Sequence, residues 1–242
     1  MALQKQKLKT TMVKEWQNRL RAAAKPEKLA VLSSFFKCGE GEYGEGDEFI
    51  GVAVPDNRRI SEQYHNAPIE VLDDMISHRI HEFRLAALLA LVKRYSKCAN
   101  DDERRAIVLY YIDQSANINN WDLVDLSCYK ILGDYQLRTG VDILSPLSDS
   151  QNMWVQRMAI VGTMPLVKKG DFEVTLRLAE QYLTHPHDLI HKATGWMLRE
   201  VGKRDEKALL AFLKTHASRM PRTALRYAIE RLSPAQRQRF LN

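Results

Sequence analysis

Long apolar runs are missing from this sequence, and glycine, proline and cysteine are all scarce. No run of about 18 apolar residues is present, so no transmembrane helix is expected. The basic start MALQKQKLKT is not followed by the apolar core of a signal peptide, so no signal peptide is expected. With 11 glycines and 8 prolines among 242 residues, the chain is neither collagen-like nor of low complexity. The hydrophobic fraction of 45% predicts a globular fold with a well-buried core.

The three cysteines cannot form a disulfide framework. Cys38, Cys98 and Cys128 lie far apart, no C-x-x-C pair occurs, and an odd number of thiols cannot pair completely. A small disulfide-stabilised scaffold is therefore excluded, and buried thiols in a reducing compartment are expected. This use of cysteine favours a cytoplasmic location.

Charge is distributed unevenly along the chain, which has a formal net charge of +6. Residues 1–37 carry nine Lys or Arg and two acidic residues, and residues 191–242 carry twelve and four. Residues 38–76 are acidic instead, with two Arg and ten acidic residues. Two basic segments predict a polyanionic partner, and nucleic acid is favoured over a membrane surface.

From about Ala67 onward the hydrophobic pattern predicts helices throughout, because apolar residues recur at intervals of three and four. Short polar turns separate these helices, and several turns offer an N-cap side chain before an apolar run. The helices pair, and each pair spans roughly 30 to 40 residues, which is typical of stacked two-helix repeats. The predicted pairs are 68–78 with 80–97, 101–115 with 121–132, 140–147 with 152–168, 171–183 with 187–203, and 205–217 with 221–232.

The sequence therefore predicts an all-α fold, an α-solenoid of HEAT-like two-helix repeats. We expect a single domain over residues 1–242, in which residues 67–232 hold the repeats and residues 233–242 form a C-terminal tail. Residues 1–66 are an atypical N-terminal part with its own helices and an acidic, glycine-rich loop.

The N-terminal part lacks the regular repeat pattern. Residues 3–37 predict two amphipathic helices broken near Pro26. The stretch CGEGEYGEGDEFIGV, residues 38–52, has little helix propensity and predicts a structured connecting loop. Its acidic residues would repel phosphate, so a phosphate-binding loop is a poor interpretation. Val54 and Pro55 then mark the start of a helix.

Three tryptophans recur beside charged residues on the second helices of three successive pairs. Spacings of three or four residues place the two members of each pair on one helix face. In a solenoid these helices line one side, so the residues predict a surface where indoles pack on sugars and bases and Arg binds phosphate. The alternative is that tryptophan fills the core between repeats, which is our interpretation of Trp154. The pairs are Trp121 with Asp125, Trp154 with Arg157, and Trp196 with Arg199.

Asp125 is the unexpected residue on this surface, because a carboxylate disfavours phosphate binding. Cleavage of an N-glycosidic bond needs such a group, since the transition state places positive charge on the sugar. A fixed carboxylate stabilises that charge and orients the attacking water. The alternative for Asp125 is an intrahelical salt bridge, and Asp122 is interpreted as an N-cap on another face.

Histidines offer a weaker alternative site. His78 and His81 stand three residues apart, and His185, His187 and His191 cluster around a proline turn. No cysteine or repeated acidic residue completes either set, and neither matches a known zinc motif. We therefore expect no metal and no cofactor.

Three further runs, NNWDLVD, MWVQRMAIV and KATGWMLREVGKRD, resemble in this order the motifs of AlkD-like DNA alkylation repair glycosylases. The segment GEGDEFIGVAVPDNRR is similar to an N-terminal segment of the same family. The resemblance covers about residues 30–232. It implies an all-helical HEAT-like solenoid that removes bases alkylated at N3 or N7 of a purine, without flipping the base into a pocket.

The resemblance also implies roles for individual residues. Asp125 matches the catalytic carboxylate, and Trp121 and Trp196 match the aromatic walls that hold the deoxyribose of the lesion. Arg157 matches a contact to the DNA backbone. Arg199, one turn beyond Trp196, matches a further phosphate contact.

These observations predict a monomeric, monofunctional DNA N-glycosylase acting on double-stranded DNA with alkylated bases. An N3- or N7-alkylated purine is cationic and leaves as a neutral base, so one carboxylate near the sugar suffices. The alternatives are a non-catalytic HEAT-like DNA-binding module and a protein-interaction scaffold. Asp125 beside Trp121 favours the enzyme over the binding module, because DNA binding alone gains nothing from a carboxylate there. The basic segments favour DNA over a protein partner.

Overall fold

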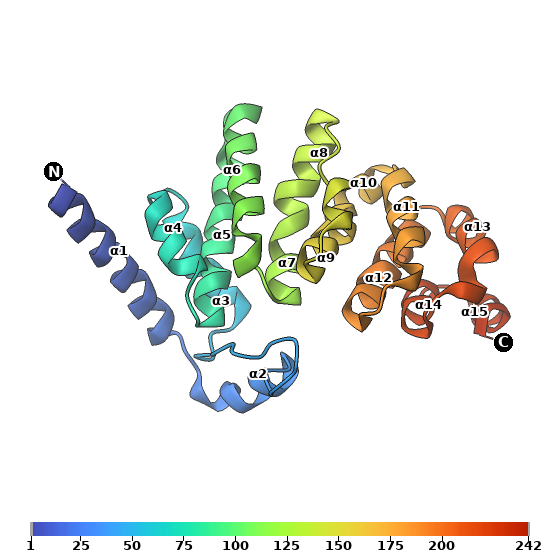
Figure 1. The fold of residues 1–242 in the computed structure, drawn as a ribbon, viewed down its shortest axis with the longest axis horizontal. Helices are drawn as coiled ribbons and strands as arrows, with labels where there is room; N and C mark the ends of the chain where they lie inside the picture. Colours follow the sequence, from blue (N-terminus) through green and yellow to red (C-terminus); the bar gives the residue numbers. More distant parts are fainter. Residues whose placement is uncertain (1, 242) are drawn as a thin grey trace. The chain divides into compact units, whose positions relative to one another are not determined.

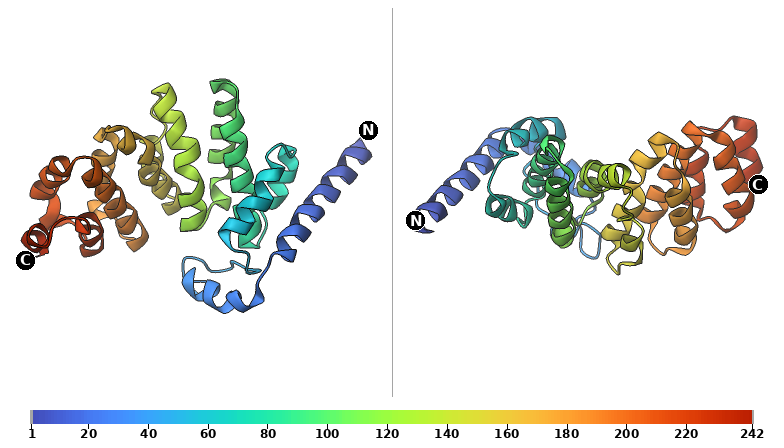
Figure 2. Two further views of the ribbon diagram at one scale, coloured as in Figure 1. Left: turned by 180° about the vertical axis from the view of Figure 1, so that it is seen from behind. Right: turned by 90° about the horizontal axis from the view of Figure 1, so that it is seen from above.

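The fold consists of α-helices joined by short turns and, between α2 and α3, by one long loop, as the computed structural model shows (Figures 1 and 2). The structure describes residues 2–241. Within that range there is no β-strand, only an isolated bridge between Glu48 and Ile80. The predicted all-α class is therefore confirmed. None of the helices described in this range is long and apolar enough to span a membrane.

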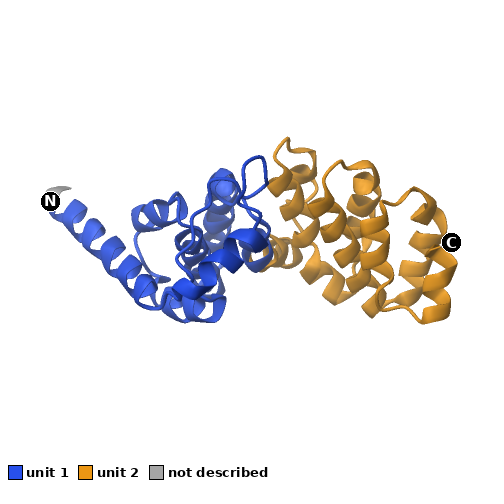
Figure 3. Cartoon of the chain, turned by 90° about the horizontal axis from the view of Figure 1, so that it is seen from below, with its two compact units in different colours: residues 1–127 blue, residues 128–242 orange. Residues whose placement is uncertain are grey.

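The chain divides into two compact units, unit 1 with residues 1–127 and unit 2 with residues 128–242 (Figure 3). The division falls near the end of a helix, α7 (Trp121–Cys128). The single domain expected from the sequence stays a prediction, and each unit is described by itself.

Unit 1 begins with a long helix, α1 (Ala2–Ala22), which is anchored by a buried tryptophan. The Trp16 ring stacks on Tyr64 with 4.4 Å between ring centroids, and its Nε1 donates a hydrogen bond to Ser61. Pro26 starts a short 3-10 turn after α1, as the sequence predicts. The remaining helices are α2 (Leu29–Phe35), α3 (Val54–Ser61), α4 (Ile69–Ile76), α5 (His81–Lys97), α6 (Asp101–Asp113) and α7.

Two predicted helix starts are confirmed in unit 1. Helix α3 begins at Val54 with Pro55 in its first turn, where a missing N–H costs nothing. Helix α6 is capped by Asn100, whose side-chain oxygen accepts the Glu103 N–H at 2.9 Å. The Glu103 carboxylate in turn accepts the N–H of Ala99 at 2.8 Å, so two orphan donors are satisfied reciprocally.

The acidic glycine-rich segment is an ordered loop, as predicted, because side chains and backbone of distant segments hold it. Gly51 has a φ of +88°, a conformation that suits glycine. Its carbonyl accepts the N–H of Lys25 at 3.0 Å. A Cβ atom at Gly51 would lie 2.3 Å from the Lys25 carbonyl oxygen, so no larger residue fits this close approach.

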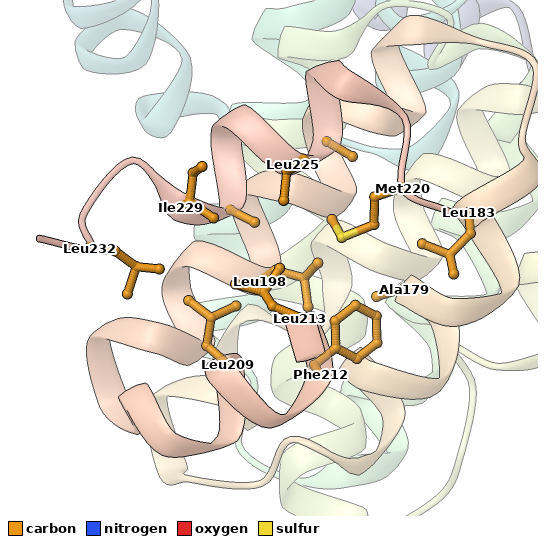
Figure 4. Close-up of a cluster of buried hydrophobic side chains, with 12 residues drawn as sticks. Ala179, Leu183, Leu198, Leu209, Phe212, Leu213, Met220, Leu225, Ile229 and Leu232 are labelled. Carbon is orange, nitrogen blue, oxygen red and sulfur yellow. The ribbon is translucent and has the colours of Figure 1, made fainter. Parts of the chain in front are cut away.

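Unit 2 packs helices around a cluster of buried aliphatic side chains (Figure 4). Leu198 of α12 meets Leu213 of α13 and Leu225 of α14 in this cluster. The helices are α8 (Asp134–Thr139), α9 (Met153–Gly162), α10 (Met164–Lys169), α11 (Glu173–Gln181), α12 (Asp188–Arg204), α13 (Glu206–His216), α14 (Arg222–Ile229) and α15 (Pro234–Leu241).

Three predicted helices differ from the structure, and two of them lie within residues 121–147. The helix expected over residues 152–168 is divided at Thr163 into α9 and α10. The helix expected to end at residue 132 continues through a π-helical turn, Tyr129–Gly133, into α8. The helix expected at 140–147 is absent, because Gly140 adopts a left-handed φ of 71° and ends α8. The Gln136 side chain then accepts the N–H groups of Ile143 and Leu144, which replaces helical bonding.

The C-terminal end of unit 2 is more regular than the sequence pattern indicates. Residues 233–242 were expected as a tail, and most of them form α15. Ser233 precedes this helix, and its hydroxyl accepts the N–H of Gln236 at 3.3 Å, as an N-cap does.

Candidate active site

A cavity of about 350 Å³ in unit 1 contains two of the predicted site residues. Trp121 and Asp125 of α7 both line it, and Lys28 of the turn before α2 lies at the same cavity. The rest of the lining is mostly apolar and comes from α2, α5 and the glycine-rich loop, with Phe35, Phe49 and Leu85 among its members. The structure therefore brings Trp121 and Asp125 together in one cavity, both half-buried.

The start of α7 is fixed by the residue that precedes it. Asn120 is fully buried, and its side-chain oxygen accepts the Trp121 N–H at 2.8 Å. Its amide nitrogen donates to Asp47 of the glycine-rich loop at 3.2 Å. This one side chain joins the loop to the first residue of α7, and so fixes the position of the Trp121 backbone.

The indole of Trp121 belongs to a group of aromatic rings. Phe36 stacks on it with 5.3 Å between centroids and 20° between planes, and Phe35 approaches it edge-on. Phe36 also stacks on Phe49 of the loop at 5.1 Å. These offset and edge-on arrangements are the favourable ones for aromatic pairs, so they fix the orientation of the indole.

Beneath these rings lies a buried charged network centred on His81. Nδ1 of His81 lies 2.9 Å from a carboxylate oxygen of Asp47, and Nε2 lies 2.8 Å from one of Asp122. The His81 and Asp47 side chains are 2% and 4% exposed, so water screens this pair weakly. Arg84 adds a contact of 2.5 Å to the other oxygen of Asp47.

The network shifts the pKa values of His81 and Asp47. Burial alone would lower the pKa of His81, but the charge and hydrogen bond of Asp122, with the hydrogen bond of Asp47, raise it to about 9. Burial alone would raise the pKa of Asp47, but His81 and Arg84 together lower it. At neutral pH these shifts favour an imidazolium at His81 and an ionised carboxylate at Asp47.

A second buried carboxylate holds the loop from α5. Glu82 is 3% exposed, and its carboxylate accepts the backbone N–H groups of Ile50, Gly51 and Val52 at 2.8 to 3.2 Å. The Glu82 carbonyl accepts the side-chain amide of Asn57 at 2.8 Å. Three N–H groups on one carboxylate satisfy a loop backbone that has no helix or sheet to bond to.

The predicted role of Asp122 as an N-cap is wrong. Asn120 occupies the position before α7, while Asp122 lies in the first turn of that helix. One oxygen of Asp122 accepts the N–H of Leu123, and the other contacts His81. Asp122 is 5% exposed, so an ion pair, rather than an exposed cap, explains this carboxylate.

The remaining predicted site residues belong to unit 2. Arg157 on α9 is 5% exposed, and its guanidinium donates to the carbonyl of Leu189 in the first turn of α12. Trp196 on α12 is half-buried. Arg199, one turn further along α12, pairs with Glu230, while its Nε is buried without a hydrogen-bond partner.

Trp154 is 8% exposed on α9, which agrees with its interpretation as a packing residue.

Sequence reasoning missed most of the residues that surround Trp121 and Asp125. Phe35 and Phe36 close an amphipathic helix, and a doublet of aromatic residues there was available as a signal. Asp47 and Phe49 lie in the GEGDEF run, which was noted only as part of a family segment. His81 was considered only as half of a metal pair.

In both histidine groups, ring nitrogens take part in hydrogen bonds within the protein. Both ring nitrogens of His81 face carboxylates, and Nδ1 of His78 accepts the N–H of Ile80. His187 likewise uses Nδ1 to accept the N–H of Leu189 at the start of α12. Among residues 2–241, no three His, Cys, Asp or Glu side chains converge as a metal site would require.

Comparison with known proteins confirms the family resemblance seen in the sequence. The family model described as DNA alkylation repair enzyme matches residues 16–232. No curated protein matches the chain. A solved structure named as a predicted DNA alkylation repair enzyme from Enterococcus faecalis shares the fold, with a TM-score of 0.68 and 21% identity over 87% of this chain and 97% of that chain. Because the family match spans most of the sequence, the chain belongs to the family of DNA alkylation repair enzymes.

Proposed function

We propose that this protein is a monofunctional DNA glycosylase that hydrolyses the N-glycosidic bond of cationic N3- or N7-alkylated purines, without base flipping. The observation that carries the proposal is that Trp121 and Asp125 line one aromatic cavity in unit 1. Family membership supports DNA as the substrate.

The chemistry needs a negative charge close to the sugar and little else. As the bond between base and sugar breaks, the deoxyribose takes on oxocarbenium character, and a fixed carboxylate stabilises that positive charge. The alkylated base leaves as a neutral molecule, so no general acid is required. In this proposal Asp125 stabilises the sugar and orients the attacking water, while the Trp121 indole holds the sugar ring.

The other carboxylates near the cavity are poorer candidates for this role. Asp47 and Asp122 pair with His81, and Glu82 accepts three backbone N–H groups. Moving any of them towards a sugar would leave a buried cation or buried N–H groups without partners, at a cost of several kcal/mol. Asp125 is proposed for the role because it lines the same cavity as Trp121.

In unit 2, Trp196 is proposed as a second wall for the deoxyribose, and Arg157 and Arg199 as DNA-backbone contacts. Arg199 pairs with Glu230 and lies one turn beyond Trp196 on α12. Arg157 is buried, so a packing role competes with its proposed contact to DNA.

A HEAT-like repeat architecture is part of the proposal, and polar contacts in unit 2 support it. These contacts repeatedly join residues 30 to 33 positions apart, about one helix pair along the chain. They include Arg157 with Leu189, Arg199 with Glu230, Ser148 with Gln181, and Gln236 with Glu206. A monomeric state and a cytoplasmic location remain predictions.

The test is release of 7-methylguanine from duplex DNA under single-turnover conditions. We expect release by the wild-type protein, and a loss of roughly a hundredfold to a thousandfold with Asp125→Asn. Duplex binding by Asp125→Asn should hold or tighten, because one repulsion towards phosphate is removed. Asp113→Asn, an exposed aspartate at the end of α6, is the matched control and should keep the full rate.

Two outcomes would contradict the proposal. Absence of base release by the wild-type protein would favour a non-catalytic DNA-binding module. Equal rates for Asp125→Asn and the wild-type protein would remove Asp125 from the chemistry.

A further inference from the structure

His81 holds both carboxylates of its network through a single ring. Asp47 comes from the glycine-rich loop and Asp122 from α7, and they are 34 and 41 positions from His81 in the sequence. The imidazole therefore joins the glycine-rich loop, α5 and α7.

The hydrogen atoms in this arrangement decide its charge. An ionised carboxylate only accepts hydrogen bonds, whereas a neutral imidazole donates from one nitrogen and accepts at the other. Both contacts of His81, at 2.9 and 2.8 Å, are satisfied at once only when both of its nitrogens carry hydrogen. With both carboxyl groups ionised, this geometry fits an imidazolium between two carboxylates.

The groups that face His81 act in opposite directions. The N-terminal end of α5 and the nearby guanidinium of Arg84 disfavour a positive charge on the ring. Asp122 from α7 and Asp47 from the loop favour it, and their effect prevails because the pKa of His81 is raised to about 9. Phe49 stacks on the ring at 4.8 Å, which adds a cation–π contact.

We propose that His81 is a positioning residue of the Trp121–Asp125 site: as an imidazolium it clamps the glycine-rich loop to the first turn of α7. Asp122 lies between Trp121 and Asp125 in the sequence, so the position of its side chain constrains the turn that carries both. Asp47 reaches the same turn through Asn120, whose side chain accepts the Trp121 N–H. The effect of His81 on activity rests on the proposed function.

Deprotonation of His81 should loosen this clamp, because one N–H···O contact is lost and two buried carboxylates then share one neutral ring. The single-turnover rate of 7-methylguanine release should stay level up to about pH 8 and fall above the pKa of about 9. A reaction without enzyme is subtracted at each pH. Duplex affinity should not show this alkaline fall, since the clamp acts on the rate of base release rather than on DNA binding.

Two substitutions distinguish the effect of the positive charge on His81 from the effect of its two hydrogen bonds. Asp122→Asn lets a neutral His81 make both contacts, because the new amide donates to Nε2 while Nδ1–H donates to Asp47. We expect this variant to keep the rate within a few-fold and to lose the alkaline fall. His81→Gln cannot bridge both carboxylates, and its rate should drop roughly tenfold to a hundredfold at every pH with duplex affinity unchanged. His65→Gln, at another half-buried histidine of unit 1, is the control and should change neither quantity.

A measurement that needs no activity completes the test. Nitrogen NMR of the imidazole should show His81 titrating near pH 9 in the wild-type protein and well below that in Asp122→Asn. The indole N–H signal of Trp121 should shift with the same midpoint, because the Phe36 ring packs against both His81 and Trp121. If no base is released but both signals titrate together, the proposed function is wrong while the clamp stands.

A His81 pKa near 6.5, or a Trp121 signal that ignores the titration, would overturn the inference. So would a rate for Asp122→Asn that falls at the same alkaline pH as the wild-type rate.

Discussion

The candidate residues of unit 1 are held in a different way from those of unit 2. Asn120 and Asp47, which fix the start of α7, are 73 positions apart in the sequence and meet through a loop. In unit 2, the contacts of Arg157 and Arg199 reach 32 and 31 positions along the chain, to neighbouring helices. Unit 1 therefore depends on buried polar contacts of an irregular segment, whereas unit 2 depends on regular packing between helices.

This difference predicts different weaknesses. A loop that bonds through a few buried side chains fails when one of those side chains is removed. Closely packed helices fail when an added atom forces their backbones apart. Hydrogen exchange read separately over residues 2–127 and 128–241 distinguishes the two cases, because it reports local opening.

The largest effect is expected from Glu82→Ala in unit 1. The substitution leaves the N–H groups of Ile50, Gly51 and Val52 buried without an acceptor, and we expect a loss of about 3–5 kcal/mol in the free energy of unfolding. Urea unfolding gives the loss, and exchange should rise over residues 38–52.

Glu82→Gln is the matched variant, because it keeps one acceptor oxygen and should lose clearly less. A loss below about 1 kcal/mol for Glu82→Ala would show that the loop does not depend on this carboxylate.

The next effect is the pH dependence of stability that His81 introduces. Its folded pKa of about 9 lies above the ordinary value of 6.5, so the folded protein binds the proton more tightly than the unfolded chain. The contribution is complete below pH 6.5 and is lost as the pH rises through about 9, a change of about 3 kcal/mol. Urea unfolding at pH 6.5, 8 and 10 measures it.

The comparison variant is His81→Gln, which has no proton to lose and should show a shallower fall over the same pH interval. Equal pH dependence in both proteins would assign the change to other groups.

In unit 2 the corresponding weak point is Gly195 of α12, where this helix packs against α14. A Cβ atom at Gly195 would lie 2.4 Å from the carbonyl oxygen of Ala224 and 2.5 Å from Cβ of Tyr227. Gly195→Ala should therefore push the two helices apart and cost about 2 kcal/mol, despite the better helix propensity of alanine. Exchange should rise in residues 188–229 and stay unchanged in unit 1. An equal rise of hydrogen exchange in both units would show that Gly195→Ala destabilises the two units together.

The same difference explains what the sequence could predict. Regular helix pairs leave a hydrophobic period, so α11 to α14 were predicted nearly in full from spacing alone. Gly140 and the π-helical turn broke the pattern around residue 140, because a single left-handed residue leaves no periodic signal.

The site divides along the same line. Trp121 and Asp125 share a helix face at a spacing of four, and that spacing is visible in the sequence. The clamp joins His81 to residues 34 and 41 positions away in the sequence, and no local sequence pattern predicts such contacts. Asp122 was misinterpreted for this reason: its local position suggested a cap, while its partner lies on a distant helix.

The smallest effect concerns Arg157, the residue on which packing and DNA binding compete. Its guanidinium is buried and donates to the Leu189 carbonyl of α12, while the proposed function places it near the DNA backbone. We expect Arg157→Ala to weaken duplex binding about tenfold, which equals about 1.4 kcal/mol. Arg157→Lys should restore only part of this affinity, because an ammonium cannot replace the planar guanidinium fork.

The salt dependence of binding then separates the two roles of Arg157. A lost phosphate contact lowers the slope of log affinity against log salt by about 0.9, whereas a packing defect leaves the slope unchanged. We expect the lower slope for Arg157→Ala. Arg177→Ala is the matched control, because Arg177 pairs with Asp142 on the same unit and its removal should leave affinity nearly unchanged. Weaker binding at an unchanged slope would assign Arg157 to the contact between α9 and α12. Arg157 would then support DNA binding by holding these two helices in place, and not by contacting phosphate itself.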